Sequence, residues 1–503
     1  MRLRQDAWAA VAVSLAVAAG CSGSSATGGA GADGGSRADA TASSSGGGGL
    51  DGQTGGDGGA QTGDSSTLAD SGSPLAACDG GNGGWRCRVD TSCAPGSPTT
   101  LKGRVFDPAG ATPLYNVVVF VPNDPAAMQA ITPGTRSCNT CDVSVGDYVA
   151  LAQTDATGSF TLTGVPSGTN VPVTVQIGKW RRTVEISTIS SCTVNTVTDG
   201  LLRLPSRRSE GDLPQLALYT GGQDDLGCLL FKFGIDASEF SAPHAGGRLD
   251  VYQGVSGGTG VGTTPGPGLS SGTAGDCTTA SCPLWATKAS LEAYDTVLLA
   301  CEGSATTTNK PASAITAMHD WLDEGGKVFA THFHYVWFQG GPADFQNVAA
   351  WKGTSIAIGT GTYDIDTTFA KGMVLSQWLT EVSGADAGNG ALALSTVGDS
   401  VGAVNTTAPQ NTTRWVYDPS TSDVKFLTFG TPIGGVSPVD GGSGVYCGKA
   451  AFTDLHAGGA PSGNIPAACS RGALTPEQQA VEFLFFDLFP TCISGGALPP
   501  PQQ

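Results

Sequence analysis

Residues 22–77 contain almost no large apolar side chain, which confines any folded core to the remainder of the 503-residue chain. Glycine, serine and alanine dominate this stretch, and its few large apolar residues are Leu50, Leu68 and Leu75. Such a segment cannot bury enough apolar surface to offset the entropy lost when its backbone is ordered. We therefore expect residues 22–77 to be a disordered tether with an r.m.s. reach of roughly 40 Å, and the folded part to begin near Cys78.

The segment before this tether has the features of an export signal. Arg2 and Arg4 precede an apolar run at positions 9–19, which is too short to cross a bilayer as a helix. The residues Ala-Ala-Gly then lead to Cys21, and this stretch resembles the lipobox of bacterial lipoproteins, in which the cysteine is lipidated. We predict that residues 1–21 are a lipoprotein signal peptide with Cys21 as the lipidation site. The alternative is an ordinary secretory signal with an incidental cysteine.

The net charge and the residues after Cys21 indicate where the protein is located and which partners it can bind. The net charge of −18 at pH 7 argues against binding to a phosphate backbone, so nucleic acid is not an expected partner. Ser22 and Gly23, with no Asp, follow Cys21, which by resemblance to Gram-negative sorting rules favours the outer membrane. We therefore expect an outer-membrane lipoprotein of the cell envelope of a Gram-negative bacterium. It would contact the membrane through its lipidated N-terminus, and a carbohydrate or an envelope protein is a further partner to test.

Cysteine usage points to the same exported setting. The chain has 14 cysteines, and setting aside Cys21 leaves an odd number, most of which are expected to pair in an oxidising compartment. Cys301 is the predicted unpaired thiol because it ends a predicted core strand. The Cys-x-x-Cys at 138–141 is compatible with a redox pair or half a zinc site, but without a second such motif a structural clasp is favoured. Local pairing is expected for Cys138 with Cys141 and for Cys277 with Cys282, while Cys78, Cys87 and Cys93 crowd a Cys-rich cap at 78–98.

Residues 99–205 have the pattern of a small antiparallel β-sandwich. Short alternating runs are separated by turn residues, and none of them has helical periodicity. The turn at 155–158 joins two such runs, and Gly158 is expected to adopt a positive φ there. Phe160 and Leu162 are predicted to point into the core. Strands are predicted at 116–121, 148–154, 159–163, 171–177 and 183–189.

Two motifs in this region match one domain family. Their residues are Gly103, Val105, Asp107, Pro108, Gly110, Pro113, Leu114, Asn116 and Val117, followed by Thr154, Asp155, Gly158, Phe160, Leu162, Val165, Pro166 and Gly168. The pattern is similar to that of the carboxypeptidase regulatory-like domain, a transthyretin-like sandwich. An insertion at 122–146 departs from the family pattern. The resemblance implies a spacer, stabilising or binding module without catalytic residues.

From 213 to 492 the pattern changes to alternating strands and helices. Continuous apolar runs such as 295–301 are typical of strands that are buried on both faces of a parallel sheet. A helix at 314–323 ends at a Gly-Gly pair, and the final helix begins with a capping box at Thr475. The order predicts an α/β doubly wound, flavodoxin-like domain, so the chain is multidomain, and 493–503 is left as a tail. Strands are predicted at 215–220, 248–253, 295–301, 327–332 and 449–456.

Three stretches of this second domain, 294–299, 328–332 and 452–456, match another family. They are similar to the class I glutamine amidotransferase-like superfamily, particularly its trehalose-utilisation-protein-like branch. The resemblance implies a nucleophilic cysteine at the end of the second stretch, where this chain has His332. It also maps the family's catalytic histidine onto His456 and its glutamate onto Gly458. Because two of the three triad positions differ, the domain is expected to be degenerate and to lack glutaminase chemistry.

The candidate site residues gather at the carboxyl ends of the predicted strands, where ligands bind in open α/β sheets. Cys301, His332 and His456 are the candidate catalytic residues. Cys301 is an alternative nucleophile, although Leu299 occupies a position where a nucleophile elbow needs a small residue. Two imidazoles with a carboxylate suit a metal ion, but hydrogen-bonded histidines are the favoured interpretation, and neither a metal nor a cofactor is predicted. Candidate ligand-binding residues are Gln223, Asp224, Glu302 and His334, the last expected to share a strand face with His332.

Three functions are compatible with this organisation. The favoured one is a tethered binding or structural module of the envelope that is non-catalytic, because the recognised triad is broken. The alternative is an exported hydrolase acting on carbohydrate or amide bonds through Cys301 or a His332/His456 site, and the third is a pure scaffold. Four tryptophans are interpreted as core packing rather than a sugar platform. They are Trp321, Trp337, Trp351 and Trp378.

Overall fold

The structure is a computed structural model that describes residue 78 and residues 83–134, 145–255, 275–353, 359–383, 390–435, 446–456 and 464–489. All of these residues belong to one compact unit, Asp70–Gln503. The predicted signal peptide, the tether, the Cys138–Cys141 pair, Gly458 and the C-terminal tail lie outside the described residues. Among the described helices, none combines the length and the apolar character needed to cross a membrane.

The first folded region consists of two small sheets that share one hydrophobic core. A three-stranded sheet has the order β4-β1-β7, and a four-stranded sheet has the order β3-β2-β5-β6. Phe160 and Leu162 are buried in the core as predicted, and Gly158 adopts a φ of 73°. The strands are β1 (Thr100–Arg104), β2 (Val118–Pro122), β3 (Tyr148–Gln153), β4 (Ser159–Thr163), β5 (Gly168–Ile177), β6 (Trp180–Ile189) and β7 (Val194–Thr196).

The pairing in these two sheets is antiparallel except at one edge. β1 pairs with β7 in parallel, whereas β1 with β4 and β5 with β6 are antiparallel. The parallel pair arises because the chain leaves the four-stranded sheet after β6 and enters the other sheet as β7. The region is therefore sandwich-like, and the expectation of purely antiparallel pairing is wrong at β7.

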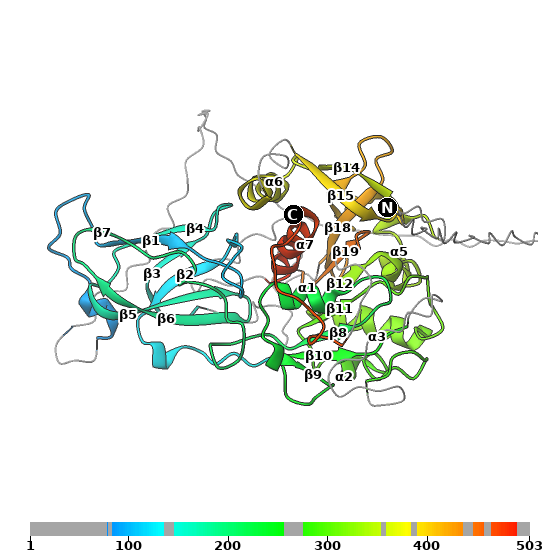
Figure 1. Ribbon diagram of the computed structural model, residues 1–503, viewed down its shortest axis with the longest axis horizontal. Helices are drawn as coiled ribbons and strands as arrows, with labels where there is room; N and C mark the ends of the chain where they lie inside the picture. The colour runs from blue at the N-terminus through cyan, green and yellow to red at the C-terminus, as the bar shows by residue number, and fades with distance from the viewer. Residues whose placement is uncertain are drawn as a thin grey trace, which may run out of the picture. The chain divides into compact units, whose positions relative to one another are not determined.

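The predicted α/β region contains a twelve-stranded mixed sheet (Figure 1). Its parallel part has the spatial order β9-β10-β8-β11-β12-β19. Five of these six strands follow the predicted positions closely, because each is an apolar run buried on both faces, whereas the two-residue β9 was not predicted. They are β8 (Leu216–Tyr219), β9 (Phe240–Ser241), β10 (Leu249–Tyr252), β11 (Thr296–Leu299), β12 (Lys327–Thr331) and β19 (Gly448–Thr453).

An antiparallel extension, which the sequence analysis did not predict, continues the sheet beyond β19. β18 pairs antiparallel with β19, and the order then runs through β17 and β14 to β15, while β16 pairs with β13 and β18. Every strand of this extension contains at least one residue that is exposed or only partly buried, whereas β8, β10, β11 and β12 are buried throughout. They are β13 (Ala349–Trp351), β14 (Gly359–Ile365), β15 (Ala391–Val397), β16 (Val401–Val404), β17 (Thr413–Tyr417) and β18 (Val424–Thr431).

Helices cover both faces of the parallel strands. Thr475 caps α7 in a capping box with Gln478, as predicted, and Asp225 caps α1 by accepting from the backbone of Cys228. Short 3-10 turns occur as η1 (Trp85–Arg88), η2 (Pro125–Ala127), η3 (Ala237–Glu239) and η4 (His332–Tyr335). The helices are α1 (Leu226–Lys232), α2 (Lys288–Leu291), α3 (Ala312–Asp323), α4 (Val336–Gln339), α5 (Ala343–Gln346), α6 (Ala370–Ser383) and α7 (Pro476–Asp487).

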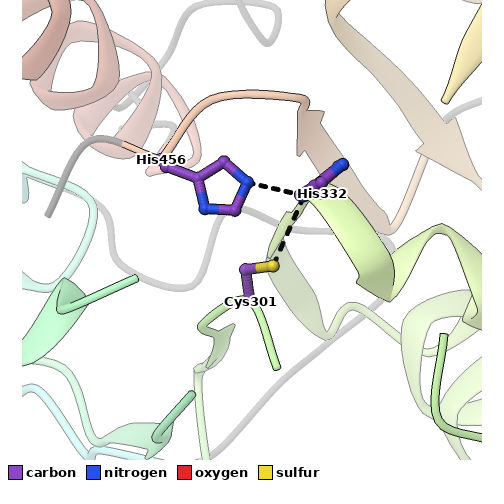
Figure 2. Close-up of side chains that lie close together, drawn as sticks. All are labelled: Cys301, His332 and His456. Atoms are coloured by element: carbon purple, nitrogen blue, oxygen red, sulfur yellow. Dashed lines mark hydrogen bonds between the residues drawn. The ribbon is translucent and has the colours of Figure 1, made fainter. Parts of the chain in front are cut away.

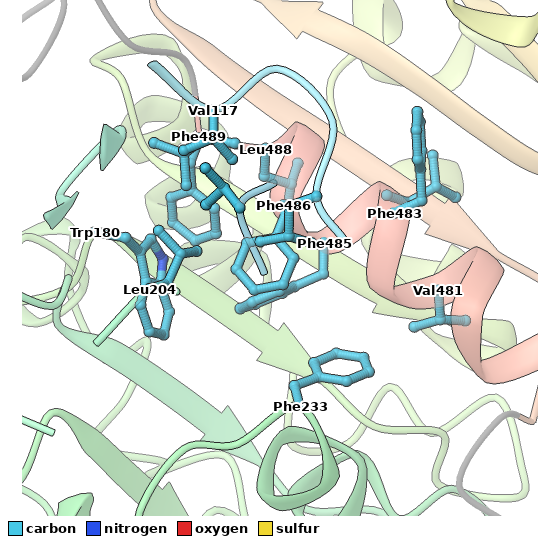
Figure 3. Packing of buried hydrophobic residues seen from close by; sticks show 14 of the residues in the cluster. Val117, Trp180, Leu204, Phe233, Val481, Phe483, Phe485, Phe486, Leu488 and Phe489 are labelled. Carbon is cyan, nitrogen blue, oxygen red and sulfur yellow. The ribbon is translucent and has the colours of Figure 1, made fainter. Parts of the chain in front are cut away.

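Alternate residues of the parallel strands belong to two separate cores. Leu218 and Leu298 pack in the cluster that also contains α1, α7 and the sandwich, whereas Tyr219 and Leu299 pack in the cluster that contains α3 and α4. This alternation is the period-2 pattern of a strand covered on both sides. Figure 3 shows the first core, in which Phe485 and Phe486 of α7 lie between Trp180 and Phe233 of distant parts of the chain.

Disulfide bonds tie several loops of the described chain together. Cys277 pairs with Cys282 as predicted, and Cys301 is a free, buried cysteine. The three cysteines of the cap do not all pair locally. Cys78 forms a disulfide bond with Cys87, whereas Cys93 forms one with Cys192. A long-range bond that local spacing could not reveal joins Cys228 to Cys469.

Candidate functional site

The site lies where three neighbouring parallel strands end. Cys301 follows β11, His332 follows β12, and His456 comes three residues after β19. Because β11, β12 and β19 are adjacent and parallel, their carboxyl ends meet at one edge of the sheet. Segments far apart in the sequence are therefore brought to one place, as is usual for ligand sites in such sheets.

The three side chains form one compact cluster (Figure 2). The Sγ atom of Cys301 lies 3.5 Å from Nδ1 of His332, and Nε2 of His456 lies 2.6 Å from the same nitrogen. Cys301 and His332 are fully buried and His456 is 6% exposed. The structure thus brings the three candidate catalytic residues together. The described residues around them shield all three from bulk solvent.

His332 has an unusual backbone conformation. The predicted strand 327–332 ends one residue earlier, at Thr331, and His332 begins the 3-10 turn η4 with a φ of 41°. A residue other than glycine is strained in this left-handed region, and the conformation persists only where the surrounding structure enforces it. The sharp turn swings the imidazole out of the strand direction and toward Cys301 and His456.

The same turn overturns the prediction for His334. A regular strand would have pointed His332 and His334 to the same face, but η4 breaks that alternation. His334 Nε2 lies 2.9 Å from the carbonyl oxygen of Ala300, and Trp337 donates to its Nδ1 at 3.3 Å. Burial lowers the pKa of His334 well below its usual value. His334 is a hydrogen-bonded core residue, separate from the cluster.

Gln223 and Asp224 reach the cluster in different ways. Gln223 contributes its backbone, since its N–H donates to the carbonyl of Cys301 at 3.0 Å and its carbonyl accepts from Nδ1 of His456 at 3.2 Å. Asp224 is buried, and its negative charge is one of the influences that raise the pKa of the Cys301 thiol. Both residues follow β8, which is the neighbour of β11 in the sheet.

Glu302 points away from the cluster into a buried ion pair. Lys310 Nζ lies 2.8 and 2.9 Å from its two carboxylate oxygens, and the hydroxyl of Tyr219 donates to the same group. Asn309 completes the network by donating to the Tyr219 oxygen and by accepting from Lys310. Because every partner is internal and Glu302 is fully buried, this residue supports the fold beneath the site.

Burial controls the protonation of the cluster. It raises the pKa of the Cys301 thiol far above its usual value, with two backbone N–H groups acting in the opposite direction. Burial, then the charge of a protonated His456 and that of Lys425, lower the pKa of His332 to about 3. Burial also lowers the pKa of His456. At neutral pH the cluster is therefore a thiol with two neutral imidazoles.

Hydrogen-bond partners determine the tautomers of these imidazoles. The carbonyl of Gln223 can only accept, so Nδ1 of His456 carries a proton and its Nε2 is a bare acceptor. Nδ1 of His332 must then donate to that acceptor, which leaves Nε2 of His332 without a proton. Among the described residues this buried nitrogen has no hydrogen-bond partner.

Two further residues complete the site, and the sequence analysis missed both. Asp454 follows β19 and is fully buried, and burial raises its pKa to about 7. Its Oδ2 accepts from the backbone of Ser400 at 2.7 Å, whereas its Oδ1 has no partner among the described residues. Gly398 leaves the space beside these groups, since a Cβ built there would lie 2.4 Å from Nε2 of His332 and 3.2 Å from Oδ1 of Asp454. The sequence analysis assigned a role to His456 in the run 452–456 but none to Asp454.

The tryptophans considered for a sugar platform are packing residues. Trp321, Trp337 and Trp378 are buried in the two cores, and Trp351 stacks on Phe338 at 5.7 Å. The core interpretation is therefore confirmed for the three buried residues.

Comparisons with known proteins leave the family of this chain open. No family model matches it, and no curated protein matches it. Among solved structures, it is similar to two mutants of the type II cohesin–X-dockerin complex Coh3ScaB–XDoc from Acetivibrio cellulolyticus. The C-terminal interface mutant is 16% identical, and the match covers 21% of this chain and 56% of that chain. The N-terminal interface mutant is 14% identical, and the match covers 29% of this chain and 78% of that chain. The TM-score is 0.14 in both cases, a value too low to support an argument about fold or function.

Proposed function

We propose that this chain is an exported, lipid-anchored envelope protein that binds a ligand at the carboxyl edge of its parallel sheet without turning it over. The observation that carries the proposal is the environment of Cys301. Its thiol is fully buried and its pKa is raised by burial, so it stays protonated at neutral pH. A cysteine nucleophile acts as the thiolate, and neither neutral imidazole is poised to generate one.

The strand order supports a flavodoxin-like assignment for the α/β region. In chain order the strands β8, β10, β11, β12 and β19 are the first to the fifth, and in space they are arranged 2-1-3-4-5. This is the order of flavodoxin-like doubly wound sheets, whose ligands bind where the order reverses. Here the reversal lies between β8 and β11, the strands that Gln223 and Cys301 follow.

The conformation of His332 supports the resemblance to the amidotransferase-like superfamily. Nucleophile elbows place their residue on a strained turn directly after a strand, and His332 occupies such a turn after β12 with a φ of 41°. The backbone feature is retained while the residue on it is an imidazole rather than a thiol. We infer that the region is a degenerate member of this superfamily that has kept a binding edge.

The sandwich-like region fits the proposed role of a stabilising carboxypeptidase regulatory-like module. Trp378 of α6 donates its indole N–H to the carbonyl of Pro113 at 2.6 Å, and Trp180 of β6 packs edge-on against three phenylalanines of the C-terminal helix region. A core shared with α7 makes this region part of one folded body. We propose that it supports the α/β region and contributes no catalytic group.

The absence of turnover is tested with the full-length protein. Glutamine, p-nitrophenyl esters and p-nitrophenyl glycosides are offered to the wild type and to Cys301→Ala, with melting curves to confirm folding. We expect no hydrolysis above the blank in either protein. Hydrolysis by the wild type that Cys301→Ala abolishes would reverse the conclusion in favour of the hydrolase.

Binding is tested by thermal shift with soluble peptidoglycan fragments as the probe. We expect a saturable rise in melting temperature that Gln223→Ala weakens, because this residue is half-buried at the edge where β8 ends. Gln129→Ala, an exposed change in the sandwich-like region, is the matched control and should leave the shift intact. Equal rises in the melting temperature of all three proteins would contradict ligand binding at this edge of the sheet.

Anchoring is tested separately by Cys21→Ser. We expect this change to abolish metabolic labelling with a fatty acid and to move the protein from the membrane fraction to the soluble fraction. Unchanged fractionation would point to the ordinary secretory signal instead.

A further inference from the structure

We infer that Cys301, His332 and His456 form a binding site for a thiophilic transition-metal ion, with Zn²⁺ as the ion to test first. The inference deepens the proposed function, because it names the class of ligand that the carboxyl edge of the sheet would bind. It rests on how the donor atoms converge, on what lies behind each of them, and on two buried polar atoms that otherwise have no role.

The donor atoms are of the right kind and are close together. One thiol sulfur and one nitrogen from each imidazole lie within 4.8 Å of one another. Zinc binds cysteine sulfur at about 2.3 Å and histidine nitrogen at about 2.0–2.1 Å, which puts neighbouring donors of a tetrahedral site roughly 3.3–3.6 Å apart. The distance of 3.5 Å between Cys301 and His332 meets this requirement. The 2.6 Å between the two imidazoles would have to widen by less than about 1 Å.

His456 is oriented as a metal ligand by its outer partner. Metal-bound histidines almost always donate their second ring N–H to a carbonyl or a carboxylate, which fixes the tautomer. Nδ1 of His456 donates to the carbonyl of Gln223 at 3.2 Å, so the lone pair of Nε2 points into the cluster. His456 therefore needs no change of tautomer to bind an ion.

His332 has an outer partner only when an ion is bound. Figure 2 shows its second ring nitrogen directed away from Cys301 and His456. That nitrogen and Oδ1 of Asp454 border the same space beside Gly398, and within the described part of the chain both are buried without a partner. If Nδ1 of His332 binds a metal, its proton moves to Nε2, the ring nitrogen that borders the same space as the carboxylate. Carboxylate, histidine and metal would then stand in the order found in protein zinc sites.

Two backbone N–H groups would stabilise an anionic sulfur at Cys301. Its sulfur accepts from the backbone N–H of Gly303 at 3.4 Å and from that of Phe333. When the ion binds, the thiol proton leaves to solvent and the thiolate forms the metal–sulfur bond, with no change in oxidation state. One thiolate and the Asp454 carboxylate then balance a divalent charge in a buried place.

A metal-free cluster explains less of the structure. A hydrogen bond between the two imidazoles accounts for their short separation, but among the described residues it leaves both Nε2 of His332 and Oδ1 of Asp454 buried without a partner. Buried polar atoms without partners are rare and unfavourable, and this pair lies directly behind the donor cluster. Metal binding satisfies both atoms in one step.

The test measures Zn²⁺ binding to the full-length, reduced protein by competition with a chromophoric chelator, and then Co²⁺ binding by absorption spectroscopy. We expect one equivalent of Zn²⁺ and a sulfur-to-cobalt charge-transfer band. Cys301→Ser should abolish the band, and His456→Gln should lower the Zn²⁺ affinity at least tenfold. Asp454→Asn should lower the Zn²⁺ affinity by about 10–100-fold, because it removes the charged partner of His332 without removing a metal ligand.

The matched control is His244→Asn. His244 is a largely exposed histidine with a φ of 61°, a conformation that asparagine tolerates, and it is remote from the cluster in the sequence. It should bind Zn²⁺ like the wild type. Circular dichroism of every variant separates loss of the site from loss of the fold, and the milder Asp454→Asn keeps the test decisive if Cys301→Ser does not fold.

The outcomes separate this inference from the proposed function. Tight binding of Cu⁺ in place of Zn²⁺, lost in the same variants, supports the site and assigns copper to it. No binding of either ion, or binding that Cys301→Ser and His456→Gln leave unchanged, overturns the inference while the absence of turnover stands. Hydrolysis that appears only with zinc supports the site and overturns the proposed lack of catalysis.

Discussion

Nε2 of His456 lies 2.6 Å from Nδ1 of His332, although 124 residues separate them in the sequence. The contact exists because β12 and β19 are adjacent parallel strands whose carboxyl ends coincide, with Thr331 paired to Thr453. Cys301 joins them from β11 on the other side of β12. The space beside this cluster, a buried ion pair, a buried pair of carboxyl groups and two disulfide bonds lead to four predictions about stability.

Gly398→Ala should destabilise the protein by displacing His332. An added Cβ would lie 2.4 Å from Nε2 and 2.5 Å from Cδ2 of that imidazole, so the fully buried ring would have to be displaced. Overpacking of this kind costs about 1–3 kcal/mol. The measurement is the free energy of unfolding in urea, together with the Zn²⁺ affinity, which should fall as well.

The matched control for this change is Gly402→Ala in β16. A Cβ there would meet its nearest neighbour, the carbonyl oxygen of Ala350, at an ordinary 3.5 Å. Its unfolding midpoint should stay close to that of the wild type. Equal losses in the two variants would contradict a specific role for the space beside His332.

Lys310→Met should be strongly destabilising because it leaves the buried carboxylate of Glu302 without its cationic partner. Lys310 and Glu302 are 1% and 0% exposed, and the ammonium is the only cation in the described structure that pairs with this carboxylate. Breaking a buried pair by removing one partner costs about 3–5 kcal/mol. The additional change Glu302→Gln should recover part of that loss, which unfolding in urea would measure.

Lys288→Met provides the comparison for the buried pair. Lys288 bonds Glu324 and Glu292 at the surface, where water and salt screen the charges. We expect no measurable change in its unfolding midpoint. If Lys310→Met proves as mild as Lys288→Met, the assignment of Glu302 to a structural ion pair is wrong.

Glu482→Gln should make the protein less sensitive to alkaline pH. Burial and then the neighbouring Asp107 raise the pKa of Glu482 well above its usual value, and burial raises that of Asp107 to about 6. The folded state therefore holds protons that the unfolded chain has released, and stability falls as the pH rises above about 4.5. The variant should match the wild type near pH 5 and exceed it near pH 8, by on the order of 1–3 kcal/mol.

The pH effect is measured by thermal unfolding across this range. Glu381→Gln, at an exposed position of α6 that pairs with Arg104, is the control and should keep the pH profile of the wild type. A wild-type stability that does not decline from pH 5 to pH 8 would falsify the buried carboxyl pair as its cause.

Removing the Cys93–Cys192 bond should cost more stability than removing the Cys78–Cys87 bond. The sequence separations are 99 and 9 residues, and the loop-closure entropy of the unfolded chain grows with this length. The expected losses are roughly 5 and roughly 3 kcal/mol for the paired alanine variants. Denaturant unfolding of both would check the order, and a larger loss for the short loop would contradict it.

Much of the fold could be predicted from local patterns. The turn at Gly158 and the capping box at Thr475 each depend on a few neighbouring residues, and both are confirmed. The parallel strands other than the two-residue β9 were predictable because continuous apolar runs suit strands buried on both faces. The antiparallel strands between β12 and β19 were not predicted, since most of them mix buried and exposed residues and so lack the continuous apolar run of a strand buried on both faces.

The site was only partly predictable. That Cys301, His332 and His456 lie at strand ends follows from the apolar runs before them, so their gathering at one edge could be expected. The turn that separates His332 from His334 could not, because a strained φ is imposed by the surrounding tertiary contacts. Asp454 was overlooked because a carboxylate next to a histidine motif is not unusual on its own.

The sequence by itself determined the alternation of elements, the local turns and caps, and the residues that end each parallel strand, because these depend on side chains near one another in the chain. Only the tertiary structure decided which strand ends are adjacent, that Glu302 turns inward to Lys310, and that Cys93 pairs with Cys192 rather than with its neighbours in the cap. Those outcomes depend on contacts between segments separated by tens to hundreds of residues. Such contacts are selected by the packing of the whole core, which no local pattern encodes.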